Sequence, residues 1–296
     1  METKVETETG PRKQILKAQS DLSGHKTSKC TMGKQNRYHK RIMRKEIWHL
    51  TDDFTKLPAK DTLKNILRDD RKNFERAELE LAEDIKLLDD AIVLYMEALQ
   101  AAYRLINKWK DNNSNRAAIA MLTSTLNYVL LTRHGVLLGY YPEVRDLLRS
   151  CYERISRCYL LFYSKKFANS FLSGEKIKQY KVDQELSRLE KDPGKEKELL
   201  KSLRQYYGFF SDVAHPNLKS LEARHGEKAL GERVGLEYVF GGFMSAELGH
   251  VMVIRILQTV LSALRILGVI LPEESGSWDK EYQQISRRCD AMVDNL

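Results

Sequence analysis

Two polar pairs in this sequence combine residue types and spacing that could do chemistry. The first lies in the stretch 206–217, YYGFFSDVAHPN, where Ser211 and His215 are four residues apart. Residues at this spacing lie one turn apart on the same face of a helix, so the two side chains are expected to project together. Pro216 disfavours helical geometry at His215, which predicts that the helix ends there, at the start of a loop. Such a pair suits a phosphate or another polar ligand.

The end of a helix also favours the protonated form of His215, because the last carbonyl groups present the negative end of the helix dipole. A purely structural role is the alternative. A histidine before proline can cap a helix carbonyl, and Ser211 can bond the carbonyl of Tyr207. Residue types alone leave both interpretations open.

The second pair lies in LLRSCYERISRCY, where Arg149 and Glu153 are also four residues apart. They flank the apolar stripe of their helix rather than lying opposite it. This pair is either a surface contact within one helix, which contributes a few tenths of a kcal/mol, or part of a groove that reaches towards Ser211 and His215.

Periodicity predicts helices that position both pairs. Ser211 belongs to a helix over 195–214 that ends at His215, and Arg149 and Glu153 belong to a helix over 142–172. The buried stripe of the second helix is expected to comprise Val144, Leu148, Cys151, Ile155, Cys158 and Phe162, with Gly174 as its stop signal.

The remaining chain is also predicted to be mainly helical. Asp61 is a candidate cap for a short helix. Further helices are expected over 71–110, 116–137, 175–191 (exposed), 245–271 and 278–294, with one short extended segment near 234–240. Only six prolines and sixteen glycines punctuate the 296 residues, which favours an all-α, up-and-down helical bundle over a β-sandwich.

Composition narrows the class of protein. The hydrophobic and charged fractions of 42% and 30% are those of an ordinary soluble protein. The apolar run 251–271 is interrupted by Arg255 and Arg265, which favours a buried core helix over a membrane span. The four scattered cysteines form no disulfide framework, so a reducing cytosol is the expected compartment.

The net charge of +8 is concentrated near the N-terminus. Residues 9–45 hold eleven Lys or Arg against the single acid Asp21, or +10, so the other residues sum to −2. We therefore expect a disordered basic tail over 1–47 and a single helical domain over 48–296. The tail is either a solvated extension without a partner or a nucleic-acid tether, for which the candidate residues are Lys34, Arg37, Lys40, Arg41, Arg44 and Lys45.

Other motifs are absent or weak. No phosphate-binding glycine loop, zinc-protease motif or nucleophile elbow occurs, and no cofactor or metal site is predicted. His134 and His250 are interpreted as satisfied core residues. Tyr140 and Tyr141 could stack on bases, but tyrosines at helix boundaries more often pack a bundle.

Taken with its order of elements, the chain resembles the helical HEPN superfamily, the higher-eukaryote and prokaryote nucleotide-binding domains. It is similar in particular to a large, poorly characterised prokaryotic group. These proteins carry an Arg-x-x-x-Glu helix, then a helix ending in Ser-x-x-x-His, a loop, an extended segment and an apolar helix. Here that order is LLRSCYE at 147–153, the stretch 207–216, then 234–240 and 245–271, within a likeness that covers about 85–275.

The resemblance implies a four- or five-helix bundle, often dimeric. Many members are metal-independent endoribonucleases, frequently toxins or phage-defence effectors. In them a histidine acts as general acid and base, and an arginine separated from it by four to six intervening residues stabilises phosphate charge in a cleft shared by two protomers.

The chain departs from that catalytic pattern. Gly208, Phe209 and Phe210 occupy the positions where the arginine should fall. Arg204 is eleven residues from His215, about 16 Å along a helix, too far to share one phosphate with it. Arg149 is the substitute that a neighbouring helix could supply.

Two functions are therefore expected. The first is a HEPN-like protein in prokaryotic stress or defence that engages RNA or a nucleotide, or cleaves RNA without metal. His215 would then be the acid and base, Arg149 would hold phosphate charge, Ser211 would orient the histidine and Glu153 would complete the groove. The second is a non-catalytic scaffold, dimeric or bound to a partner protein, with a nucleic-acid-tethering tail.

Overall fold

The computed structural model describes residues 58–189, 191 and 245–295. Every regular element among them is helical, which confirms the all-α prediction. The α-helices are α4 (Ala59–Glu80), α5 (Ala82–Leu105), α6 (Asn113–Leu138), α7 (Tyr141–Tyr163), α8 (Lys165–Leu172), α9 (Gln179–Leu189), α12 (Ala246–Ile270) and α13 (Asp279–Asp294), with short 3₁₀ turns at Ile106–Trp109 and Ser275–Ser277. The helix predicted over 195–214, the extended segment over 234–240 and the N-terminal tail lie outside the described residues.

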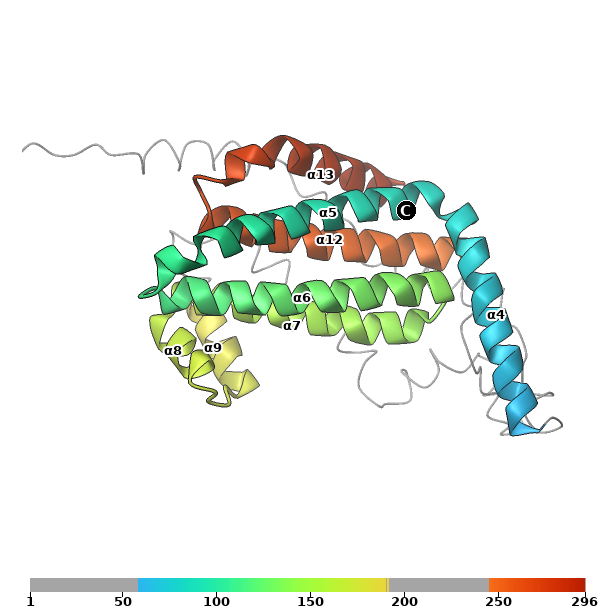
Figure 1. Cartoon of the computed structure of the whole chain (residues 1–296), viewed down its shortest axis with the longest axis horizontal. Coiled ribbons are helices and arrows are strands. Elements are labelled where there is room, and N and C mark those ends of the chain that lie inside the picture. Colours follow the sequence, from blue (N-terminus) through green and yellow to red (C-terminus); the bar gives the residue numbers. More distant parts are fainter. Residues whose placement is uncertain (1–57, 190, 192–244, 296) are drawn as a thin grey trace, which may run out of the picture.

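Four long helices, α5, α6, α7 and α12, lie side by side and form the bundle (Figure 1). α13 packs on α12 and α5, whereas α4 projects from one end and α8 and α9 form a small lobe at the other. α5, α6 and α7 alternate in direction, as an up-and-down bundle requires. α12 runs in the same direction as α7, because Ser245, just before α12, is bonded to Tyr141 at the start of α7.

α12 is the most deeply buried helix of this bundle. Side chains such as Ile254, Leu257 and Leu264 are almost fully buried, and each contributes roughly 1.5–3 kcal/mol relative to an exposed position. Among the described helices it alone is long and apolar enough to cross a membrane, but 72% of its most apolar window is buried in the protein. Burial on that scale agrees with the interpretation of 251–271 as a core helix.

The turn between α6 and α7 follows directly from the local sequence. Gly139 adopts a left-handed conformation, φ 78°, that ends α6, and Pro142 lies in the first turn of α7. The two helices then approach closely, since a Cβ atom on Gly135 would lie 2.8 Å from Val144.

Two long helices predicted from the sequence are in fact broken. The helix expected over 71–110 begins at Ala59 and breaks at Leu81. The Leu81 side chain packs closely against Gly249, since a Cβ atom on Gly249 would lie 2.5 Å from it. The helix expected over 142–172 breaks at Ser164, which is extended. Neither Leu81 nor Ser164 is a glycine or proline, so we attribute the position of both breaks to tertiary packing.

The predicted stripe of α7 is confirmed. Its first five members are fully buried, and Phe162 packs partly buried against the core. α9 is less exposed than expected, because Val182, Leu186 and Leu189 are buried. Asp61 lies in the first turn of α4 but does not cap it, since the cap position is Pro58.

Candidate functional site

The structure describes one of the two predicted pairs. Arg149 and Glu153 lie on α7, within the helix that the sequence predicts, and both side chains are partly buried. Ser211 and His215 lie outside the described residues, as do the six basic residues of the tail: Lys34, Arg37, Lys40, Arg41, Arg44 and Lys45. The predicted meeting of the two pairs therefore remains a prediction.

Arg149 and Glu153 form an ion pair within their own helix. Arg149 Nε donates to Glu153 Oε1 at 3.1 Å, and the two side chains are 20% and 28% exposed. A pair at this spacing contributes a few tenths of a kcal/mol to stability. Glu153 thus holds the guanidinium in place on a part of α7 that solvent still reaches.

One turn earlier, Arg145 is almost fully buried. The residue is 6% exposed, and its Nε atom has no hydrogen-bond partner. Burial lowers the pKa of Arg145 to about 10, although the nearby Asp146 opposes this shift. Burying a cation with an unpaired donor is unfavourable, so Arg145 lowers the free energy of unfolding.

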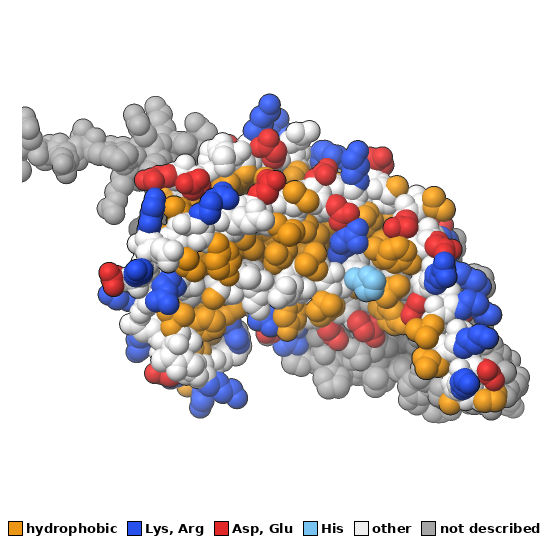
Figure 2. Space-filling view, viewed as in Figure 1, with side chains coloured by type: hydrophobic (Ala, Val, Ile, Leu, Met, Phe, Trp, Pro, Cys, Tyr) orange, Lys and Arg blue, Asp and Glu red, His pale blue; other side chains and the backbone are white. Residues whose placement is uncertain are grey.

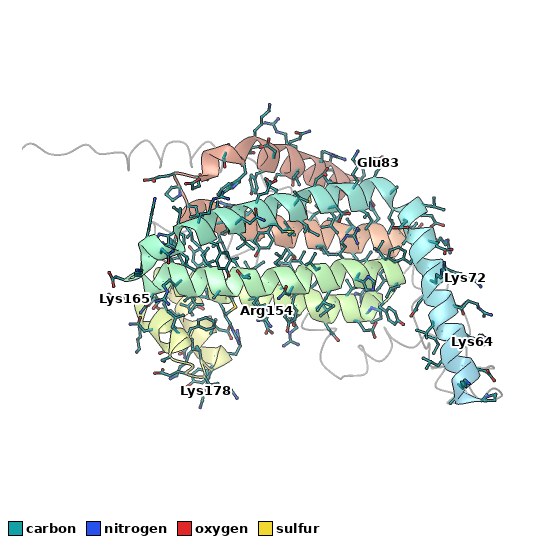
Figure 3. All side chains as sticks on the ribbon, viewed as in Figure 1. Lys64, Lys72, Glu83, Arg154, Lys165 and Lys178 are labelled. Carbon is teal, nitrogen blue, oxygen red and sulfur yellow. The ribbon has the colours of Figure 1, made fainter. Side chains whose placement is uncertain are left out.

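Two further arginines lie further along α7, nearer the α8–α9 lobe. Arg154 lies where α7 runs alongside α6, and its guanidinium carbon is 4.0 Å from the centre of the Tyr128 ring (Figure 3). Arg157 Nη2 donates to Gln179 Oε1 of α9 at 2.6 Å. In both residues Nε is buried and has no hydrogen-bond partner.

These observations combine into one distinctive property of α7. In the described part of the chain, three buried side-chain polar atoms lack a hydrogen-bond partner, and all three are the Nε atoms of Arg145, Arg154 and Arg157. Buried polar groups are paired in nearly all native structures, so unpaired donors need an explanation. All three belong to one helix, α7.

Sequence reasoning missed these three arginines, although a signal was present. Positions three and four residues away from Arg145 and Arg154 hold no acid. Arg157 has one acid at that spacing, Glu153, which is already bonded to Arg149. A count of acidic residues three and four positions away from each arginine would have distinguished these arginines from those that form ion pairs within their helix.

The other candidate residues have structural partners. Tyr141 Oη bonds the backbone of Ser245, and Tyr140 Oη lies 2.9 Å from Asp70, which together with burial raises the pKa of Tyr140 to about 12. Both tyrosines therefore pack the bundle. His250 Nδ1 lies 2.5 Å from Asp84, as a satisfied histidine should. His134 is exposed, so its interpretation as a core residue is wrong.

No group of three or more histidine, cysteine or acidic side chains in the described residues could hold a metal ion. Comparison with models of protein families, with curated proteins and with solved structures finds no match to this chain.

Proposed function

We propose that this chain is a HEPN-like protein that engages RNA, or a nucleotide, through the arginine-bearing side of α7. The observation that carries the proposal is the gathering of arginines on that helix, whose buried Nε donors have no hydrogen-bond partner in the described residues. An arginine presents a rigid fork of donors that matches the oxygens of a phosphate, and the side chains of Arg149, Arg154 and Arg157 are partly exposed.

In the enzymatic form of the proposal, the protein is a metal-independent endoribonuclease, or a weakened relative, in prokaryotic stress or defence. His215 takes and delivers protons, Ser211 orients it, and Arg149, held by Glu153, stabilises charge on the phosphate. Support comes from chain connectivity: the segment that contains His215 rejoins the described structure at Ser245, which is hydrogen-bonded to the start of α7.

The test is cleavage of total RNA by the full-length protein in the presence of EDTA. Wild type is expected to cleave RNA, and His215→Ala to abolish cleavage, because the proton-transfer group is lost. His134→Ala is the matched control, since it removes an exposed histidine from α6, and it should keep wild-type activity. Cleavage that EDTA stops, or that survives His215→Ala, would contradict the enzymatic form.

A second candidate, a non-catalytic interaction protein, is favoured by the outer face of α5 and α6. Hydrophobic side chains gather across the middle of this face (Figure 2). They are Val93, Met96, Tyr103, Leu130 and Leu131, each at least 40% exposed. The occupant that we propose for this face is a second copy of the chain.

Charge supports that choice. Asp90 and Arg104 lie seven residues on either side of Glu97, about 10 Å along α5 in each direction. A twofold axis across the middle of α5 would place Asp90 of one protomer opposite Arg104 of the next on both sides of the axis, and these two ion pairs would have to offset the approach of the two Glu97 side chains at the axis.

Sedimentation velocity tests this second candidate. Wild type should be dimeric, Asp90→Arg and Arg104→Asp should each dissociate the dimer, and the double exchange should restore it. A wild-type protein that stays monomeric at tens of micromolar would exclude this interface.

A further inference from the structure

The α8–α9 lobe and the opposite end of the bundle carry charge of opposite sign. Residues 164–182 of the lobe contain one acid, Glu175, and five lysines: Lys165, Lys166, Lys176, Lys178 and Lys181. Residues 78–90, around the start of α5, contain six acids and one lysine, Lys86. Lys165 and Lys178 lie towards one end of the molecule, and Glu83 lies at the other (Figure 3). An extended anionic surface would therefore attract the lobe and repel the opposite end.

The positive charge of the lobe faces solvent. All five lysines are exposed, and none of them forms an ion pair within the described residues. The acids that follow them in α9 already have partners, since Asp183 accepts from Gln179 Nε2 at 3.0 Å and Glu185 accepts from Arg188 Nε at 2.9 Å. The lobe thus presents cations that the described structure does not neutralise.

Apolar side chains are exposed among these lysines. Leu172, at the end of α8, is 40% exposed, and Tyr180, in the first turn of α9, is 54% exposed. The chain turns between them at Gly174, whose φ is 78°. Tyrosine rings favour the headgroup layer of a bilayer, and lysine side chains beside them can reach the lipid phosphates. This combination of groups therefore fits a lipid surface.

The lobe is held firmly against the bundle. The inner sides of α8 and α9 are buried at Ala168, Val182, Leu186 and Leu189. Asn113 Nδ2 of α6 donates to Asn169 Oδ1 of α8 at 2.8 Å, and Arg157 Nη2 of α7 donates to Gln179 Oε1 of α9 at 2.6 Å. The exposed groups are thus arranged before binding, which lowers the entropy cost of association.

We propose that the α8–α9 lobe docks on the surface of a bilayer that contains anionic lipid. The compact charge of lysine suits the diffuse negative potential of such a surface, whereas arginine is the better match for fixed phosphates. Residues 164–182 contain no arginine. A bilayer would also bury Leu172, which a sugar–phosphate chain would leave in water. The proposal goes beyond the proposed function, because it does not involve the arginines of α7.

The contact is shallow and reversible. Only the exposed side chains of the lobe enter the headgroup layer, and α12, which is long and apolar enough to span a membrane, stays buried in the bundle. A lysine close to an anionic membrane surface strengthens binding about fivefold. Five lysines are therefore sufficient to recruit the protein to such a membrane without the insertion of a helix.

The experiment measures co-sedimentation of the full-length chain with vesicles of phosphatidylcholine, alone or mixed with about one-quarter phosphatidylserine, at about 0.1 M salt. Wild type should bind the mixed vesicles and not the neutral ones. The double variant Lys165→Gln, Lys166→Gln should bind the mixed vesicles about 25-fold more weakly. Glu175→Gln removes the exposed acid and should strengthen binding.

A matched control separates the lobe from net charge. The double variant Lys64→Gln, Lys72→Gln removes two exposed lysines from α4 and should bind the mixed vesicles like wild type (Figure 3). The basic stretch 9–45 is the same in every variant, so differences among them report on the substituted side chains.

A second readout shows which part of the molecule meets the lipid. In vesicles that contain brominated phosphatidylcholine, Tyr180→Trp should be quenched more than wild type, which has three tryptophans of its own. Leu79→Trp is the matched control, because Leu79 is 81% exposed on α4, away from the lobe. The tryptophan of this control should show no added quenching.

The possible failures are distinguishable. Equal binding of wild type and of the Lys165 and Lys166 double variant, with no added quenching in Tyr180→Trp, overturns the lobe as a docking surface. Equal binding to neutral vesicles overturns the assignment to anionic lipid. If the double variant loses affinity for RNA but not for vesicles, the lobe is a nucleic-acid surface and the proposal is wrong. None of these results affects the proposed function, which RNA cleavage by His215→Ala tests.

Discussion

Two regions of this bundle treat charged side chains in opposite ways. At the end where α5 and α12 begin, acids of α4 and α5 bond across to other helices: Asp84 to His250, Asp89 to Arg133, and Asp70 to Tyr140. Along α7, Arg145, Arg154 and Arg157 have buried Nε atoms without partners. The first region uses ion pairs and hydrogen bonds of acids to join helices, whereas in the second the Nε donors of three arginines stay without a hydrogen-bond partner in the described structure.

The sharpest test of this difference is Arg145→Met. Methionine fills a similar volume without the cost of burying an unpaired cation, so we expect the free energy of unfolding to rise by about 1–4 kcal/mol. RNA binding should change little, because Arg145 is only 6% exposed. Urea denaturation of wild type and variant measures the first effect, and loss of stability in Arg145→Met would show that the guanidinium has a stabilising partner.

At the end of the bundle where α5 and α12 begin, we expect a substitution to lower the free energy of unfolding instead. Arg133 donates to both oxygens of Asp89, at 2.5 and 2.7 Å, and this hydrogen bond raises the pKa of Arg133. The side chains are partly exposed, so Asp89→Asn should lower the free energy of unfolding by only about 1 kcal/mol. RNA affinity should not change, and a loss of binding in Asp89→Asn would remove the contrast between the regions.

The pair His250 and Asp84 predicts a pH dependence at the same end. The hydrogen bond to Asp84 raises the pKa of His250 above its ordinary value of 6.5, although burial opposes the shift. Because the folded pKa is the higher one, this stabilisation is fully present below about pH 6.5 and is lost as the pH rises through the folded pKa.

Asp84→Asn should remove that part of the pH dependence. The measurement is the free energy of unfolding of both proteins between pH 5.5 and 8.5. If the two curves stay parallel across this range, the histidine does not titrate as inferred.

The fold and the candidate site differ in how far they can be predicted from the sequence. The α6–α7 turn and the core helix α12 follow from local patterns, since Gly139 predicts the turn and a long, largely apolar run predicts the core helix. The break at Leu81 does not, because it depends on contact with Gly249, which is distant in sequence. Local helix propensity is readily overridden by packing of this kind.

The candidate site shows the same division. The spacing of Arg149 and Glu153 predicted that their side chains could meet on one helix, because a single helix sets that geometry. The stacking of Arg154 on Tyr128 depends on how α6 packs against α7, which periodicity alone does not reveal. Whether Ser211 and His215 reach this surface is a long-range question of the same type.

The smallest expected effect on stability comes from a substitution in α7, where Glu153 could act on both the stability of the helix and the binding of an anion. Glu153→Gln removes the ion pair with Arg149 and should lower the free energy of unfolding by only a few tenths of a kcal/mol. It also removes the acid that is bonded to Arg149, so RNA should bind more tightly, with a steeper salt dependence. Thermal unfolding and the fluorescence anisotropy of a labelled RNA measure the two effects on the same protein. Weaker RNA binding in Glu153→Gln would instead mean that Glu153 is needed to position the Arg149 side chain. The glutamate would then favour anion binding rather than oppose it.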